Sequence, residues 1–532
     1  MNRNEMLERV REHRKIWDFI IIGGGATGIG CAVDAATRGF DVLLVEQSDF
    51  GKGTSSRSTK LVHGGVRYLA QGNISLVREA LRERGILLEN APHLVHKQAF
   101  VIPVYSYWDK FFYGAGLKTY NLLSGKNGFG KSQILSKKQT LEHLPNIKEE
   151  NLEGGIIYFD GQFDDTRLLI NLAQTAAENK AVLLNYARVF AFNRNDDGKV
   201  DGVAVSDEIT GQIFLAKAKV VINATGAFCD ALRQMSDRKA EKIIALSQGI
   251  HLVFDKNFLP TENALMIPKT SDERVLFAIP WHEHLVIGTT DTPIEKPELE
   301  PLAQEKEIEF ILKTAAEYLE NPPRREDILS IFTGIRPLVK NESSTNTATL
   351  SRDHMIEIND SNLLTITGGK WTTYRAMAED AITQGIKLAE LPEVNCVTKR
   401  TKIHGHEKDA SEKNGLEIYG ADAFEIQKLI DENAETGKKL HPDLPYRKAE
   451  IVWFCRTEMA QTVEDILARR TRALFLNARA AIEIAPQIGG ILVEELKIEF
   501  AEIWLAENLT NFYKTAENYL PKKQVQKANQ NL

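Results

Sequence analysis

Apolar and polar positions near the start of the chain follow the order expected for a strand, a helix and a second strand. Residues 18–22 (DFIII) form a short apolar run, which predicts a buried strand. This run leads into a glycine-rich turn and a helical segment that begins near Ala26. A second apolar run at residues 41–45 predicts another strand. Residues 18–46 are therefore expected to form a strand–turn–helix–strand unit of an α/β fold.

Similar patterns predict further elements up to about residue 390. Helices are expected at residues 74–88 and 164–180. A polar turn at residues 195–199 separates two apolar runs, which predicts a hairpin. Residues 217–226 predict a buried strand that runs into a turn, and residues 274–291 predict two strands joined by a polar turn. Residues 363–386 predict a strand followed by a glycine turn and a helix.

The pattern changes after about residue 400. Residues 421–519 have helical spacing and few turn residues, which predicts a separate helical domain. Within it, residues 464–485 (EDILARRTRALFLNARAAIEIA) form the clearest predicted helix. We therefore expect a polar leader at residues 1–17, an α/β region at 18–390, a helical domain at 400–520 and a polar tail at 521–532.

Composition narrows the classes of function. The chain has 532 residues, of which 43% are hydrophobic, and its length suggests about two to four domains. A net charge of −7 argues against a broad nucleic-acid-binding surface. Residues 1–17 lack the apolar segment of a secretory signal, and no apolar run predicts a membrane-spanning helix. The four cysteines are far apart, so a reducing compartment is expected, without a disulfide framework or a metal site.

The turn after the first strand points to a dinucleotide. Residues 23–28 (GGGATG) fit the pattern GxGxxG, whose glycines let the backbone approach a pyrophosphate at the start of the helix. Glu46 ends the second strand, where an acidic residue binds a ribose hydroxyl and disfavours NADP. This motif alone does not separate FAD from NAD.

Two further observations favour FAD. Residues 219–226 (KVVINATG) resemble the second signature of flavoproteins, a strand that ends in ATG beside the cofactor. The sequence contains no second GxGxxG, a motif common in enzymes that reduce flavin with NAD(P)H. The chain is therefore predicted to bind FAD and to reduce it directly with a substrate.

Six segments together carry a family resemblance. They closely resemble, in order, segments of the FAD-dependent, respiratory glycerol-3-phosphate dehydrogenases. The resemblance covers about residues 18–385, and the helical C-terminal domain matches the cap of that family. The segments are TSSRSTKLVHGGVRYL (54–69), YFDGQFDDTRL (158–168), IPWHEHLVIGTTDTP (279–293), TGIRPL (333–338), LSRDH (350–354) and GGKWTTYRAMAEDA (368–381).

The resemblance implies a fold and a reaction. The fold is α/β, with a Rossmann-like FAD-binding domain of the D-amino-acid-oxidase type, an inserted α+β substrate domain and an all-helical C-terminal domain. The reaction is oxidation of sn-glycerol 3-phosphate to dihydroxyacetone phosphate, with electrons passed through FAD to a membrane quinone. The FAD domain is expected at about residues 18–100, 155–245 and 330–385, and the substrate domain at about 100–155 and 245–330.

The resemblance also implies a location, while other functions stay open. A cytoplasmic protein bound peripherally to the inner face of the cytoplasmic membrane is expected, and a homodimer is allowed. Oxygen in place of the quinone would make the chain a glycerol-3-phosphate oxidase. A flavin-containing structural or RNA-associated protein is a remoter alternative, against which the net charge of −7 argues. Amino-acid and sarcosine oxidases of this fold act on carboxylates and need fewer cations.

Cations are needed to hold a small dianionic substrate, and the resemblance indicates which ones. Arg67, Tyr68 and Arg352 are expected at the phosphate end. Arg336 and Lys370 are expected nearer the flavin and the reacting C2 oxygen, where they would take part in catalysis.

A base must accept the proton of the C2 hydroxyl, and histidine has a suitable pKa. His251 lies at the start of a predicted strand where the family has a histidine, so it is the expected base and substrate ligand. His63 is the rival, although a place beside the flavin suits it better.

Residues expected to contact FAD come from the motifs and from the resemblance. They are Gly23, Gly24, Gly25, Ala26, Thr27, Gly28, Glu46, Thr54, Ser55, Ser58, Lys60, His63, Gly64, Gly65, Val189, Ala224, Thr225, Gly226, Gly334, Gly369, Lys370 and Thr372.

Two surface candidates remain. Residues 468–472 (ARRTR) are expected to be solvated or ion-paired, or else to contact anionic lipid or the FAD domain. The aromatic-rich residues 105–114 could enter a membrane interface near a quinone entrance or pack in the core. Residues 193–204 superficially match a calcium loop but lack its final glutamate, so a hairpin turn is expected there.

Overall fold

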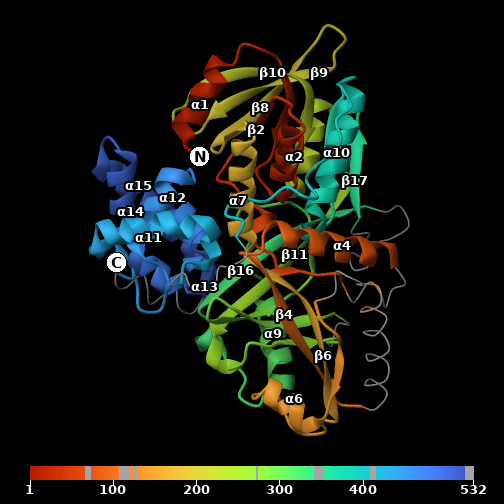
Figure 1. Cartoon of the computed structure of the whole chain (residues 1–532), viewed down its shortest axis with the longest axis vertical. Coiled ribbons are helices and arrows are strands. Elements are labelled where there is room, and N and C mark those ends of the chain that lie inside the picture. The colour runs from red at the N-terminus through yellow and green to blue at the C-terminus, as the bar shows by residue number, and fades with distance from the viewer. Residues whose placement is uncertain are drawn as a thin grey trace.

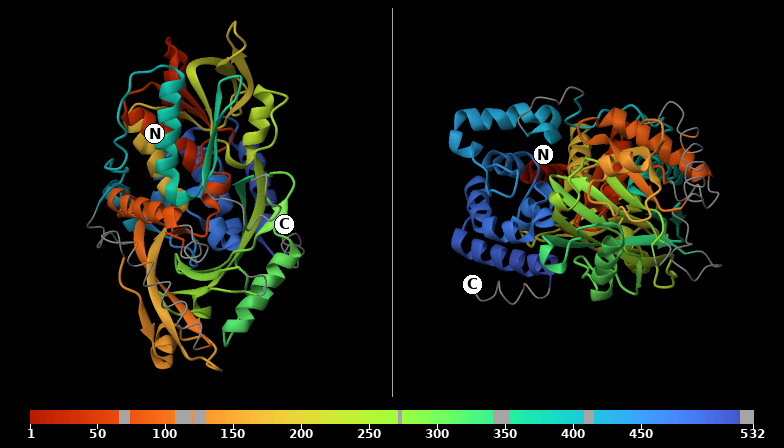
Figure 2. Two further views of the ribbon diagram at one scale, coloured as in Figure 1. Left: turned by 90° about the vertical axis from the view of Figure 1, so that its right-hand side faces the viewer. Right: turned by 90° about the horizontal axis from the view of Figure 1, so that it is seen from below.

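The chain folds into three packed parts. The computed structural model describes residues 1–65, 74–106, 120, 123, 129–270, 274–340, 353–407 and 415–521. An α/β part contains the N-terminus, a second sheet lies below it, and a helical C-terminal part lies at one side (Figure 1). The two views in Figure 2 show that the C-terminal helices flank both of the other parts.

A largely parallel sheet forms the centre of the α/β part. Its strands run in the order β17-β18-β10-β1-β2-β7, and β1 pairs in parallel with both β2 and β10. Residues 19–21 of β1 are completely buried, as expected for a central parallel strand that is covered on both faces. The strands are β1 (Trp17–Ile22), β2 (Val42–Val45), β7 (Val182–Leu184), β10 (Ile213–Asn223), β17 (His354–Ile358) and β18 (Leu363–Gly368).

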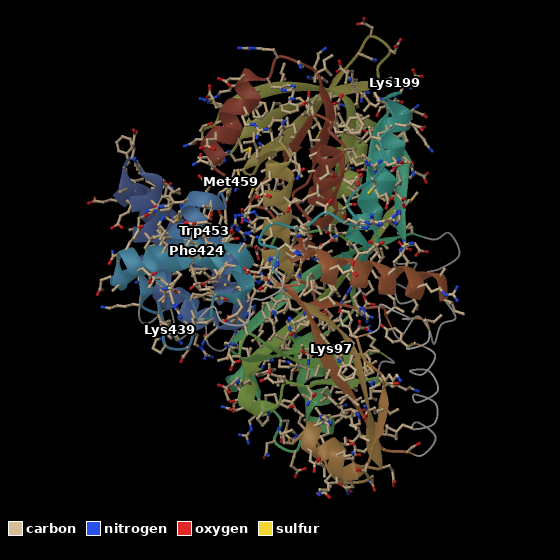
Figure 3. The ribbon with its side chains drawn as sticks, in the orientation of Figure 1. Lys97, Lys199, Phe424, Lys439, Trp453 and Met459 are labelled. Carbon is tan, nitrogen blue, oxygen red and sulfur yellow. The ribbon has the colours of Figure 1, made fainter. Side chains whose placement is uncertain are left out.

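Helices from distant parts of the sequence cover this sheet. Helix α2 (Ala26–Thr37) packs against both α7 (Asp165–Glu178) and α10 (Tyr374–Leu388). The hairpin predicted around residues 195–199 is confirmed, because β8 (Ala187–Arg194) and β9 (Val200–Asp207) pair antiparallel. Lys199, at its turn, lies at the outer end of this part (Figure 3).

The second sheet is mostly antiparallel and is built around two long strand pairs. Strand β11 (Ile244–Asp255) pairs with β16 (Ser330–Val339), and β4 (Val95–Val104) pairs with β6 (Gly154–Phe163). Helix α9 (Glu305–Tyr318) packs on β11, and α4 (Ile74–Asn90) joins the two sheets at their boundary. The other strands are β3 (Leu61–Val62), β5 (Gln133–Leu135), β12 (Ala264–Ile267), β13 (Leu276–Trp281), β14 (His284–Gly288) and β15 (Thr292–Ile294).

The C-terminal part is helical, and its apolar core continues into the second sheet through Trp281 and Phe332. Its core residues include Phe454, Ile466 and Leu492, which are fully buried. The helices are α11 (Ala423–Glu432), α12 (Lys448–Thr457), α13 (Ala473–Leu476), α14 (Ala478–Leu496) and α15 (Ala501–Ala516). In the polar leader, α1 (Arg3–Glu12) joins this part to the α/β part, because the amino group of Met1 donates to the carbonyl of Thr457 at 2.7 Å.

The prediction of one continuous helix over residues 464–485 is wrong. A π-helical turn covers Asp465–Arg470, and Arg472 then adopts a left-handed conformation with φ of 64°. Asn477 is extended, and its side chain accepts from the amide of Ala480 to cap α14. The helical pattern of the sequence is overridden here because arginine side chains are drawn into the interface with the α/β part.

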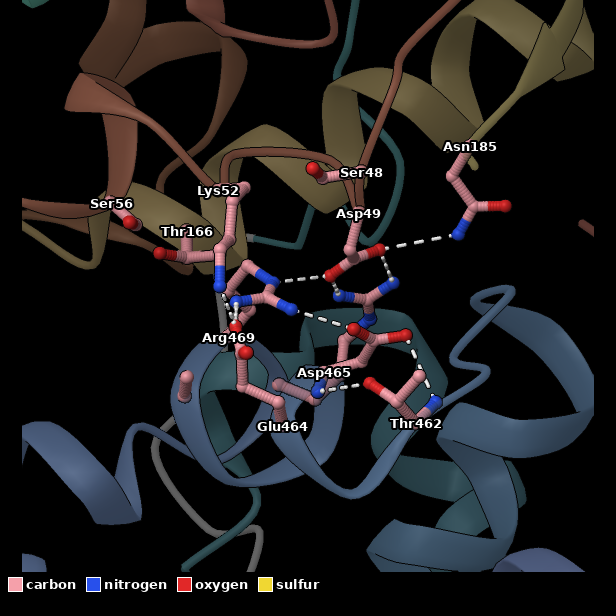
Figure 4. Close-up of polar contacts among 12 residues, drawn as sticks. Ser48, Asp49, Lys52, Ser56, Thr166, Asn185, Thr462, Glu464, Asp465 and Arg469 are labelled. Carbon is pink, nitrogen blue, oxygen red and sulfur yellow. Dashed lines mark hydrogen bonds and ion pairs between the residues drawn. The ribbon is translucent and has the colours of Figure 1, made fainter. Parts of the chain in front are cut away.

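These arginines also correct the expectation that residues 468–472 could be solvated or could contact lipid. Arg469, Arg470 and Arg472 are at most 3% exposed. Arg469 and Arg470 bind Asp49 (Figure 4). Arg472 donates to Oγ1 of Thr166 at 2.9 Å. The cluster is therefore both ion-paired and in contact with the α/β part, which confirms these two alternatives. Among the residues that the structure describes, no helix has both the length and the apolarity needed to cross a bilayer.

Candidate active site

A cavity of about 370 Å³ lies at the carboxyl ends of β1, β2, β10 and β18. Ligands of open α/β sheets bind at this edge, where the strand order reverses. The cavity lining comes from stretches that are far apart in the chain. The lining residues are 22, 23, 25–27, 45–47, 51–55, 187–189, 224–228, 231, 232, 235 and 366–371, with Leu299 and Pro337.

The glycine turn between β1 and α2 has the close packing that a dinucleotide site needs. A Cβ on Gly28 would lie 1.9 Å from the carbonyl oxygen of Gly23, and a Cβ on Gly23 would lie 2.6 Å from that of Ala224. Gly23 also has φ of +116°, which L side chains rarely adopt. The backbone therefore passes close to the cavity, and the positive end of α2 faces it, as binding of a pyrophosphate requires.

Glu46 lies at the end of β2 and lines the cavity. Its carboxylate accepts hydrogen bonds from the amides of Gly24 at 2.6 Å and Ser48 at 2.9 Å. Burial raises the pKa of Glu46 above its ordinary value, although these two amides oppose the shift. A carboxyl group held at this position fits a ribose hydroxyl of the cofactor.

The other end of the cavity is formed by the turn between β18 and α10. Gly368 and Gly369 have φ of 78° and 70°, and Lys370 follows them at the start of the short helix Trp371–Thr373. The indole nitrogen of Trp371 donates to the carbonyl oxygen of Ser55 at 2.8 Å. This contact holds the two lining segments together, and Ser55 also accepts from the amide of Ala26 at 2.9 Å.

His251 and Arg336 come from the paired strands β11 and β16. His251 is 2% exposed, and its Nε2 lies 3.0 Å from Oγ1 of Thr59. Burial lowers the pKa of His251 well below its ordinary value, and the charges of Lys60 and Arg336 lower it further. The imidazole is therefore neutral near pH 7.

Arg336 points toward the turn that follows β14. Its Nη2 donates to Oγ1 of Thr289 at 3.0 Å, and its Nη1 lies 3.6 Å from a carboxylate oxygen of Asp291. Gly249 makes room for this side chain, because a Cβ there would lie 2.4 Å from Nη2 of Arg336. A cation thus lies on the same pair of strands as the neutral His251.

Two family profiles match the chain. One, described as FAD dependent oxidoreductase, matches residues 18–381, and the other, the C-terminal domain of alpha-glycerophosphate oxidase, matches residues 364–503. The human protein "Glycerol-3-phosphate dehydrogenase, mitochondrial" is 42% identical over 515 residues, which cover 90% of this chain and 70% of the relative. The chain belongs to the FAD-dependent glycerol-3-phosphate dehydrogenase family. An Arabidopsis thaliana mitochondrial member is 38% identical over 94% of this chain and 87% of its own length.

A solved member of the glycerol-3-phosphate dehydrogenase family has the same architecture. The enzyme from Bacillus halodurans, solved with FAD, is 29% identical with a TM-score of 0.80 over 98% of both chains. L-alpha-glycerophosphate oxidase from Mycoplasma pneumoniae, at 19% identity and a TM-score of 0.56, supports the fold alone. These matches confirm the D-amino-acid-oxidase-type fold with its helical C-terminal domain, and FAD as the cofactor.

The structure brings most of the predicted cofactor residues of this family member to the cavity. Gly24 and Gly28 belong to the glycine turn but lie outside the lining. The predicted residues that line the cavity are Gly23, Gly25, Ala26, Thr27, Glu46, Thr54, Ser55, Val189, Ala224, Thr225, Gly226, Gly369 and Lys370.

A second group of predicted cofactor residues lies around the boundary of the two sheets. The amide of His63 donates to Oγ1 of Thr372 at 3.3 Å, and the amide of Gly64 donates to the hydroxyl of Tyr120 at 3.0 Å. Gly65 has φ of 76°. Gly334, on β16, lies where a Cβ would be 2.8 Å from the carbonyl oxygen of Arg57. Arg67, Tyr68, Arg352 and residues 107–114 lie outside the described residues.

Lys60 and Ser58 share a partner that sequence analysis missed. The ammonium of Lys60 lies 2.7 Å from Asp165, and the hydroxyl of Ser58 donates to the same carboxylate oxygen at 2.7 Å. Burial lowers the pKa of Lys60 to about 7, against the opposing charge of Asp165. Asp165 lies at the acidic start of α7, where the sequence pattern predicts only the beginning of a helix. The sequence also did not predict the contact between Thr59 and His251.

Proposed function

We propose that this chain oxidises sn-glycerol 3-phosphate to dihydroxyacetone phosphate with FAD as the hydride acceptor. The observation that carries the proposal is the 42% identity to human glycerol-3-phosphate dehydrogenase over 90% of the chain. The geometry supports it, because a cavity suited to FAD lies in the same molecule as a neutral buried histidine and an arginine on adjacent strands.

Each of three residues has a proposed role in the reaction. His251 accepts the proton of the C2 hydroxyl, for which its imidazole must be neutral. Arg336 and Lys370 supply positive charge beside the C2 oxygen, which gains negative charge as the proton leaves. Bound FAD supplies the acceptor for the hydride from C2.

The phosphate group requires its own cations. Arg67 and Arg352 are proposed to bind it through their forked guanidinium groups, with Tyr68 as a further hydroxyl donor. Their sequence contexts, GVRY and SRDH, support this assignment.

A membrane quinone is the proposed electron acceptor. The relatives at 38–42% identity are named dehydrogenases, which favours an acceptor other than oxygen. The match of residues 364–503 to a domain named for an oxidase keeps oxygen as the second candidate. Peripheral binding to the inner face of the cytoplasmic membrane and a homodimer are part of the same proposal, and no nucleic-acid partner is expected.

One anaerobic experiment tests both parts. Glycerol 3-phosphate is added to the purified protein, and the flavin absorbance is followed. The proposal expects bleaching, with faster reoxidation by a soluble quinone analogue than by air. An unchanged flavin spectrum contradicts the substrate, whereas faster reoxidation by air replaces the quinone with oxygen as acceptor.

A further inference from the structure

Residues 47–55, the segment after β2, lie between the FAD cavity and the C-terminal helices. One side of the segment lines the cavity through Gln47 and residues 51–55. The amide of Gly51 also donates to the carbonyl oxygen of Gly24 at 3.0 Å, which ties the segment to the glycine turn. A displacement of this segment would therefore change both the wall of the cavity and the turn expected to hold the pyrophosphate.

Asp49 anchors the outer side of the segment. Its carboxylate is fully buried and lies 2.5 Å from Nε of Arg469 and 2.7 Å from Nη1 of Arg470 (Figure 4). Burial alone would raise the pKa of Asp49, but the two guanidinium groups outweigh it and hold the pKa below its ordinary value. Asp49 is thus a carboxylate between two cations of another domain.

Lys52 connects the C-terminal part directly to the wall of the cavity. It lines the cavity, pairs with Glu464 of the C-terminal part, and lies 2.7 Å from Glu300. Arg469 joins the two anchors, since its Nη1 lies 2.7 Å from the same Glu464. Asp49, Lys52, Glu464 and Arg469 therefore form one continuous network across the domain boundary (Figure 4).

The segment has little regular structure to hold it in place. Its one helical turn is the short helix Thr54–Ser56, and Gly51 and Gly53 lie just before that turn. Arg472 donates to the carbonyl oxygen of Ser56 at 2.5 Å, so the C-terminal part also holds the end of this turn. Charged hydrogen bonds of this kind are stronger than neutral ones, and breaking a buried one leaves an uncompensated charge.

We propose that the C-terminal domain completes the FAD site. Asp49 and Arg469 act as positioning residues: their contact holds residues 47–55 in the conformation that retains FAD. This inference concerns retention of the cofactor, so it stands or falls independently of the substrate.

Release of FAD from the purified holoenzyme tests the proposal. Asp49→Asn and Arg469→Gln each weaken the network without touching the cavity lining. We expect each to accelerate FAD release about tenfold or more, because a tenfold change corresponds to about 1.4 kcal/mol and a hydrogen bond to a charged group contributes at least that much. The measurement is the rise in free-flavin fluorescence after dilution.

Arg38→Gln is the matched control. Arg38 at the end of α2 binds Asp34 at 2.6 Å, and both side chains are as buried as those of the network. This pair lies within the α/β part and contacts neither residues 47–55 nor residues 464–472. Faster release in the two network variants than in the control supports the proposal, and equal release in all three overturns it.

Hydrogen exchange on the unaltered protein tests the proposal even if the variants do not fold. FAD binding is expected to slow amide exchange at residues 464–472, which do not line the cavity, relative to FAD-depleted protein. Helix α14 is the internal reference, because it lies beyond the network. Equal exchange at residues 464–472 with and without FAD overturns the proposal.

Discussion

The imidazole of His251 lies nearly parallel to the ring of Phe332, with ring centroids 4.7 Å apart and 12° between the planes. The two residues face each other across the β11–β16 pair. The stack restricts rotation of the imidazole, so that Nε2 stays beside Thr59. The proposed general base is therefore neutral and held in one orientation.

Replacing His251 with Gln is expected to slow flavin reduction by about 100- to 10,000-fold, the usual contribution of a positioned base. Stopped-flow reduction by glycerol 3-phosphate without oxygen measures this rate. FAD content should match that of the unaltered protein, since His251 lies outside the cavity lining. A variant with full FAD and an unchanged reduction rate would exclude His251 as the base.

Arg336→Ala should weaken substrate binding and slow flavin reduction while FAD stays bound. Loss of one hydrogen bond from a charged group costs about 1.5–3 kcal/mol, which predicts a decrease in kcat/KM of roughly 10- to 100-fold. Arg336→Lys keeps the charge but not the forked geometry, so it should restore only part of the loss. If Ala and Lys variants both retain normal kcat/KM, the proposed role of Arg336 is wrong.

Gly28→Ala should abolish FAD binding and destabilise the protein. Its Cβ would lie 1.9 Å from the carbonyl oxygen of Gly23, a backbone atom that cannot move without opening the turn. Overpacking of this kind costs about 1–3 kcal/mol or more. FAD absorbance and the thermal midpoint measure the two effects.

Gly53→Ala is the control for this substitution, because a Cβ at Gly53 would meet nothing within 4 Å although the residue lines the same cavity. Normal FAD binding by Gly28→Ala, or an equal loss in both variants, would contradict the packing argument.

Stability should depend on pH through His404. Its ring lies 2.5 Å from Glu178 on α7 and 2.8 Å from Asp422 before α11. Burial alone would lower the pKa of His404, but the hydrogen bonds to Asp422 and Glu178 raise it from 6.5 to about 9. The stabilisation is therefore complete below pH 6.5 and is lost as the pH rises through about 9.

Urea unfolding of the unaltered protein and of His404→Gln checks this dependence. The difference in the free energy of unfolding should be largest at pH 6 and should disappear above pH 9. A difference that stays constant from pH 6 to pH 10 would show that His404 contributes through packing rather than charge.

The sequence predicted best what is decided locally. Residues 18–46 were predicted as a unit because the apolar strands, the glycine turn and Glu46 follow one another within a short stretch of sequence. The hairpin at residues 195–199 was predicted for the same reason, since a polar turn between apolar runs needs no distant partner. Residues 224–226 (ATG) and the lack of a second GxGxxG then extended the prediction to FAD, and the family resemblance extended it to the candidate substrate site.

The sequence did not predict contacts between residues that are far apart in the chain. The pairing of Lys60 with Asp165, 105 residues away, depends on how α7 packs and leaves no periodic pattern. The break in the helix at Arg472 has the same origin, because a buried contact to Thr166 outweighs the helical preference of the surrounding residues. Tertiary contacts of this kind override local propensity.

The scattered origin of the cavity wall has a consequence for synthesis of the chain. The lining begins at residue 22 and is not complete until residue 371, and the ion pairs that brace it extend to residue 470. A growing polypeptide therefore cannot enclose the flavin until most of its length has left the ribosome. Proteins usually fold domain by domain during translation. Here the first strand and its glycine turn, although made earliest, must wait until residue 371 has been made before the wall of their cavity is complete.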